Sequence, residues 1–69
     1  MKYTKITKQA ANEFILEFDK QAIAHELKEG DEFKHEGIQH KIVRFYPGMT
    51  LPGCYTFLVI TRTRDQQAR

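Results

Sequence analysis

The chain has 69 residues and a formal net charge of +2. Its length allows a single domain, and such a domain buries only about 60% of the surface of its unfolded chain, which leaves little volume for a deep active site. Hydrophobic residues make up 41% of the chain and charged residues 29%, which fits a globular domain and argues against disorder. The longest apolar stretch, FLVI, is far too short for a membrane span, and the N-terminal residues lack the apolar run of a signal peptide.

The cysteine count and the charge distribution indicate the cellular environment of the chain and the charge of its partner. Cys54 is the single cysteine, so no internal disulfide can form, which suits a reducing cytoplasm. Residues 1–37 hold six Lys and eight Asp or Glu, a net charge of −2, whereas residues 38–69 hold five Lys or Arg and one Asp, a net charge of +4. This asymmetry points to an anionic partner for the C-terminal part.

The N-terminal third predicts two strands, of which the second is ambiguous. Residues 2–7 can form a short strand. In residues 13–18, EFILEF, a strand would place Phe14, Leu16 and Phe18 on one face and both Glu side chains on the other. A helix would instead gather a stripe that runs from Ala11 to Ala22. We favour the strand, because it separates the apolar from the acidic side chains, and the helix remains open.

Residues 19–30 predict a helix. Asp19 is a good N-cap and Gly30 a good C-cap, and the residues between them are sound helix formers. Ile23 and Leu27 are one turn apart and would anchor the helix to a sheet. Lys28 near the C-terminal end suits the helix dipole.

Beyond Gly30 the pattern is typical of strands. Residues 32–34 and 38–45 fit a hairpin around a turn at residues 35–37, residues 46–53 a connection, and residues 54–63 a last strand. In the last strand Phe57 would face one side, whereas Leu58 and Ile60 would face the other. Apolar residues on both faces predict a central strand covered on each side, so we expect Phe57, Leu58 and Ile60 in the core.

These elements predict a single small α+β domain over residues 1–64, with one helix packed on an antiparallel sheet and a frayed tail at residues 65–69. The Gly-Asp turn at residues 30–31 leads into a strand, as in the entry hairpin of a small barrel. The sheet can therefore be barrel-like, of an SH3-like or PUA-like kind. That pattern is shared by many unrelated folds, and a fold alone does not define a function.

The sequence offers no recognisable catalytic or metal-binding pattern. A structural zinc site needs closely paired Cys or His ligands, whereas this chain has one cysteine, and His35 and His40 have opposite strand parity unless the turn between them reverses it. Cys54 has no local signature of a base that would activate it. The stretch PGMTLPG lacks the glycine spacing and the Lys of a phosphate-binding loop. We therefore expect no enzyme activity, no cofactor and no metal.

A mixture of basic and aromatic residues on the last two strands is typical of single-stranded nucleic-acid binding, in which cations neutralise phosphates and rings stack on bases. In a regular strand Lys41 would share a face with Phe45, and Arg44 would point with Ile42, so the cations need not form one patch. They can equally be the ordinary basic rim of a sheet. The candidate nucleic-acid-binding residues are Lys41, Arg44, Tyr46, Tyr55, Arg62 and Arg64.

Two Pro-Gly pairs, at residues 47–48 and 52–53, bracket the connection. Each pair suits the two central positions of a type II turn, and two such turns would hold Met49 and Leu51 in a fixed position. These side chains either cap the barrel end or project as an apolar contact. A preorganised loop would lower the entropic cost of binding.

The sequence thus predicts a non-catalytic binding module in the cytoplasm, with no membrane partner. Its leading partner is nucleic acid, bound through residues 46–53 and the adjacent basic strands. The alternative is a protein-binding adaptor or small inhibitor that uses Met49 and Leu51. A third hypothesis is a small enzyme built on Cys54. The sequence indicates neither a choice between DNA and RNA nor an oligomeric state.

Overall fold

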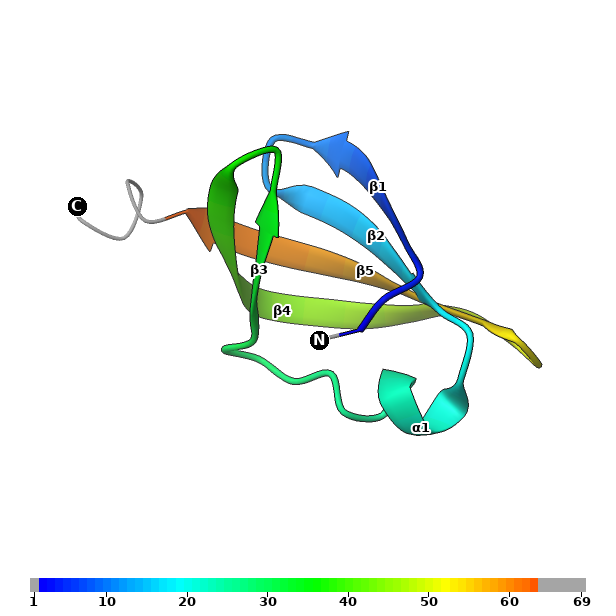
Figure 1. Cartoon of the computed structure of the whole chain (residues 1–69). Coiled ribbons are helices and arrows are strands. Elements are labelled where there is room, and N and C mark those ends of the chain that lie inside the picture. The colour runs from blue at the N-terminus through cyan, green and yellow to red at the C-terminus, as the bar shows by residue number, and fades with distance from the viewer. Residues whose placement is uncertain (1, 64–69) are drawn as a thin grey trace.

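A computed structural model describes residues 2–63 of the chain. Within them, five antiparallel strands form one sheet in the order β1-β2-β5-β4-β3, which curls into a half-barrel (Figure 1). The only helix in residues 2–63 is α1 (Gln21–Ala24), so the domain is mostly strand and fits the expected α+β class only loosely. The strands are β1 (Lys5–Ala10), β2 (Glu13–Phe18), β3 (Glu32–His35), β4 (Ile38–Leu51) and β5 (Cys54–Thr63).

The alternation expected for residues 13–18 is confirmed, and the helical alternative is wrong. Phe14, Leu16 and Phe18 are all buried on the concave side of the sheet, which we call the inner face. On β5 their direct partners include Val59, which is also fully buried. Each such side chain contributes about 1.5–3 kcal/mol when it leaves water, so this face holds most of the stabilising burial.

The half-barrel is closed by side chains across its open side. The two edge strands, β1 and β3, are not hydrogen-bonded to each other. Tyr3, just before β1, instead packs edge-on against Phe33 of β3 with ring centroids 6.2 Å apart, and Phe33 packs in turn against Phe14 at 5.4 Å. These edge-to-face contacts join the two ends of the sheet over the core.

The central position of β5 is confirmed, because β5 lies between β2 and β4. Its coverage on both sides is not confirmed. Leu58 and Ile60 lie on the opposite, convex side of the sheet, which we call the outer face, and are only half-buried. Phe57 packs against the core from the inner face. The expectation that Leu58 and Ile60 are core residues is wrong. Helix α1 packs through Ala24 on the inner face only, so it does not cover these two side chains.

The expected helix over residues 19–30 is largely wrong. Helix α1 has four residues, its N-cap is Lys20 rather than Asp19, and no side chain caps it. The chain leaves the helix at His25 and runs to β4, where the N–H of Gly30 donates to the carbonyl of Ile42 and the N–H of Ile42 donates to the carbonyl of Asp31. The N–H groups of Glu26 and Leu27 still donate to carbonyls three residues before them, and pairing with β4 begins only at Gly30 and Asp31.

The expected connection over residues 46–53 is also wrong, because β4 continues to Leu51 and reverses at a two-residue turn. In that turn Gly53 has φ +79°, as the type II turn expected for residues 52–53 requires. The first strand, β1, covers Lys5–Ala10 and not residues 2–7 as expected. The expected hairpin turn is confirmed, with Glu36 and Gly37 both at positive φ. In residues 2–63 no helix is long and apolar enough to span a membrane.

Candidate interaction surface

A β-bulge in β4 places the basic side chains of the two long strands on the outer face. Lys41 lies directly opposite Arg62, the register shifts between Ile42 and Arg44, and Arg44 then lies opposite Ile60. Because Ile60 and Arg62 are two residues apart on β5, they and their partners share a face. The extra residue reverses the alternation of a regular strand, so the expectation that Arg44 points away from Lys41 is wrong.

The two candidate tyrosines lie on opposite faces of the sheet. Tyr46 lies opposite Leu58, on the outer face, and is 48% exposed. Tyr55 lies opposite Phe18, on the inner face, and is half-buried. The two rings therefore cannot stack on the same run of bases. The remaining candidate, Arg64, lies outside the described residues.

An apolar row crosses the outer face between these charges. Ile15 of β2 lies opposite Leu58 of β5, and Leu58 lies opposite Tyr46 of β4, so the three side chains form one transverse row. Ile60 lies next to Leu58 on the same side of β5. Leu58, Ile60 and Ile15 are half-buried, so the centre of the outer face offers apolar area that the described residues leave partly uncovered.

Carboxylates share the outer face with the cations. Glu13 of β2 lies opposite Ile60, on the other side of Ile60 from Arg44. Glu32 of β3 lies directly opposite Lys41. The outer face thus carries both signs of charge around an apolar centre, and it is not a uniformly positive surface.

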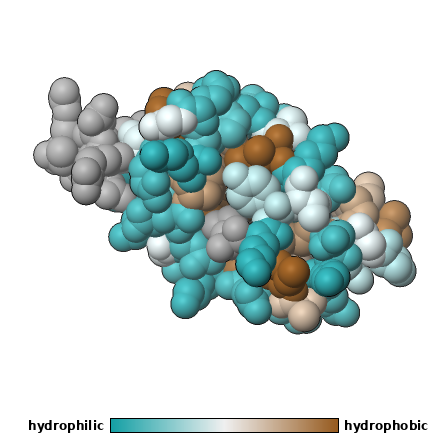
Figure 2. Space-filling view, in the orientation of Figure 1, coloured by the Kyte–Doolittle hydropathy of each residue, from teal (hydrophilic) through white to brown (hydrophobic). Residues whose placement is uncertain are grey.

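The tip of the β4–β5 hairpin extends this surface beyond the barrel. Met49 and Leu51 are 51% and 56% exposed, so they project and do not cap the barrel. Figure 2 shows hydrophobic atoms at that end of the molecule. The N–H of Met49 donates to Oγ1 of Thr56 at 2.7 Å, and its Sδ lies 3.8 Å from Sγ of Cys54. A thioether cannot act as a general base, so this neighbour does not activate the Cys54 thiol.

A hollow of about 340 Å³ opens on the inner side, between α1 and the β4–β5 arm. The residues that line this hollow are Gln21, Ala24, His25, Thr50, Pro52, Tyr55 and Phe57. Tyr55 therefore faces this hollow and not the basic surface.

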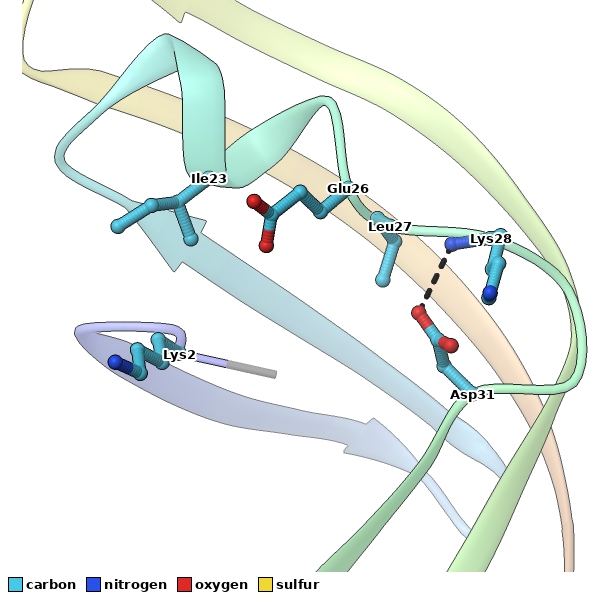
Figure 3. Close-up of a pocket in the computed structure, with 6 residues that line it drawn as sticks. All are labelled: Lys2, Ile23, Glu26, Leu27, Lys28 and Asp31. Atoms are coloured by element: carbon cyan, nitrogen blue, oxygen red, sulfur yellow. Dashed lines mark hydrogen bonds between the residues drawn. The ribbon is translucent and has the colours of Figure 1, made fainter.

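A second hollow, of about 270 Å³, lies beneath the segment that follows α1 (Figure 3). Ile23 and Leu27 form its apolar wall, and charged side chains surround it. The carboxylate of Asp31 accepts a hydrogen bond from the N–H of Lys28 at 3.0 Å. This carboxylate therefore stabilises the turn at residues 28–31.

A buried histidine is the feature that the sequence did not reveal. His40 is 4% exposed and packs against the rings of Phe14 and Phe33, with centroids 4.7 and 5.4 Å away. The pKa of His40 is lowered from its usual value, mainly because burial removes the ring from water and also because the positive charges of His35 and Lys8 lie nearby. Within residues 2–63, no three His, Cys, Asp or Glu side chains gather closely enough to hold a metal ion.

No family model, no curated protein and no solved structure matches the chain.

Proposed function

We propose that the chain is a non-catalytic binding module of the cytoplasm that contacts a protein partner through the outer face of its sheet. The main observation behind this proposal is the transverse row of Ile15, Leu58 and Tyr46, which crosses three strands on the outer face of the sheet. Contiguous apolar patches on a protein surface often mark protein–protein interaction sites, whereas single exposed apolar residues are ordinary.

The composition of the outer face supports a protein partner. An apolar, aromatic centre with a charged rim is the usual anatomy of a protein–protein interface. Here the centre is the row around Leu58, and Glu13, Lys41 and Arg44 stand at the rim. Met49 and Leu51 lengthen the apolar area toward the hairpin tip.

Single-stranded nucleic acid is a second candidate partner. The bulge that aligns Lys41, Arg44 and Arg62 on one face, with Tyr46 beside them, favours this candidate. Such a site would bind phosphates through the cations and stack one base on the ring. Glu13 and Glu32 on the same face oppose it, because they repel phosphates.

A pull-down from the source lysate, with and without nuclease, separates the two partners. For a protein partner, the tagged wild type retains a specific protein after nuclease treatment, and Tyr46→Ala and Leu51→Ala lose it. Ile38→Ala is the matched control, because Ile38 is 51% exposed but lies at the far end of β4 from the tip. Retention that is equal in all variants would overturn the protein proposal.

The nucleic-acid candidate is tested with labelled oligonucleotides in a fluorescence-anisotropy titration at several salt concentrations. Each phosphate contact should add about 0.7 to the slope of log K against log salt. Arg62→Glu should therefore weaken binding to every sequence alike, since phosphate contacts carry no sequence information. The absence of binding by the wild type at low salt would exclude this partner.

A further inference from the structure

The outer face is arranged symmetrically about its central strand. In one row Ile60 of β5 has Glu13 on its β2 side and Arg44 on its β4 side. In the next row Leu58 has Ile15 on the β2 side and Tyr46 on the β4 side. Each row therefore pairs chemically complementary groups at equal distances from β5: opposite charges in the first, and an aliphatic with an aromatic side chain in the second.

This arrangement is self-complementary under one rotation. Two sheets that pack face to face in a symmetric dimer are related by a two-fold axis in the plane between them. If that axis runs along β5, β2 of one copy lies over β4 of the other, and each row faces its own counterpart. Glu13 then meets Arg44, Ile15 meets Tyr46, and Leu58 meets Leu58.

We propose that the outer face docks a second copy of the same chain in this orientation. The inference rests on the proposed function, in that it takes the outer face as a protein-contact surface and names its partner. Aligned packing of two sheets at about 30° is a common geometry for antiparallel sheets. An unrelated partner would require no matching of Glu13 with Arg44 across the central strand.

The remaining charges limit the size of the contact. Arg62 follows Ile60 on the same side of β5, so the two-fold axis would bring it toward Arg62 of the second copy, and the contact ends there. Glu17 lies opposite Lys5 within its own sheet, in the row beyond Ile15 and Leu58. The sheet also curls across its strands, so its convex face limits contact to β5 and its two neighbours, β2 and β4 (Figure 1). A small interface of this kind is expected to be weak and reversible.

Sedimentation velocity on the purified full chain, in reductant and over a range of about 10 µM to 1 mM, tests the inference at the concentrations expected for a weak interface. The wild type should shift from monomer to dimer as concentration rises. Glu13→Arg and Arg44→Glu should each weaken the dimer more than about tenfold, because each places two like-charged pairs in the interface. Glu26→Arg, an exposed charge reversal beside α1, should leave dimerisation unchanged.

The decisive sample is an equimolar mixture of the Glu13→Arg and Arg44→Glu variants. In the mixed dimer both cross-copy pairs again join opposite charges, so dimerisation should recover toward the wild-type level although each variant alone dimerises much more weakly. A wild type that stays monomeric at 1 mM, or a mixture that stays monomeric, overturns the inference. If the pull-down still depends on Tyr46, the proposed function survives that failure. If instead only oligonucleotides bind in the anisotropy titration, both proposals fail.

Discussion

Nδ1 of His40 lies 3.0 Å from Oγ1 of Thr61, and both residues are buried within the half-barrel. The hydrogen bond links β4 to β5 next to the aromatic rings of Phe14 and Phe33, which pack against His40. Every buried side-chain nitrogen and oxygen in the described residues has a partner. His40 is therefore held as a neutral ring, because a second proton would place a charge in an apolar site next to Lys8 and His35.

We expect the stability of the domain to fall as pH drops from about 7.5 to 5.5, the range in which a histidine takes up its proton in the unfolded chain. The folded pKa of His40 is lowered from its usual 6.5, so below that value the unfolded chain binds more protons than the folded one. Linkage then reduces the free energy of unfolding by at most about 1.4 kcal/mol per pH unit. Below the folded pKa no further loss comes from this group.

Urea unfolding of wild type, His40→Gln and His25→Gln across that range measures the effect. The His40→Gln variant should show a flatter dependence on pH, since glutamine keeps a hydrogen-bonding group but does not titrate. His25→Gln is the control, because His25 is exposed. Equal slopes in all three proteins would show that His40 does not carry the pH dependence.

A side chain at Gly48 should destabilise the hairpin. A Cβ atom there would lie 2.6 Å from Oγ1 of Thr56, the same atom that accepts the hydrogen bond from the N–H of Met49. Gly48→Ala should therefore displace this hydroxyl and cost about 0.5–1.5 kcal/mol for the lost hydrogen bond. Thr56→Ala removes both the obstacle and the bond, so Gly48→Ala should cost clearly less in that background. Four denaturation curves complete the cycle, and strictly additive losses would contradict the expected coupling.

The sequence identified those features that depend on local alternation and turn chemistry. Phe14 and Phe18 share a face because residues two apart in a strand do so, and Gly37 marks its turn because positive φ favours glycine. The length of the helix was not predictable, since pairing of Gly30 and Asp31 with Ile42 outweighs helix propensity. Nor was the bulge before Arg44, which depends on contacts with β5 and determines which face the cations occupy.

Replacement of Asp19 should have almost no effect on stability. Asp19 is exposed, and α1 begins after Lys20 without a side-chain cap. Asp19→Ala should thus stay within about 0.5 kcal/mol of wild type, as surface substitutions usually do. Thermal unfolding followed by circular dichroism measures the difference. A loss near 1 kcal/mol, the usual effect of removing a cap, would show that Asp19 caps the helix in solution.

The two faces of the sheet should differ sharply in what they contribute to folding. Leu16 of β2 is fully buried on the inner face, whereas Leu58 of β5 is half-buried on the outer face. Leu16→Ala should cost about 2–5 kcal/mol, because it leaves a cavity in the core, and so could unfold a domain of this size. Leu58→Ala removes the same atoms from a site that water already reaches, so its cost should be below about 1 kcal/mol.

Urea unfolding at about 5 µM protein, a dilution at which a weak dimer dissociates, compares the two leucine variants without a contribution from self-association. A Leu16→Ala chain too unstable to give a folded baseline would still show the asymmetry, provided that Leu58→Ala keeps a dispersed amide spectrum. Equal losses would mean that the outer face is covered in solution even at that dilution. A Leu58→Ala chain that folds normally but no longer sediments as a dimer at 1 mM would assign Leu58 to contact with the second copy and Leu16 to the core.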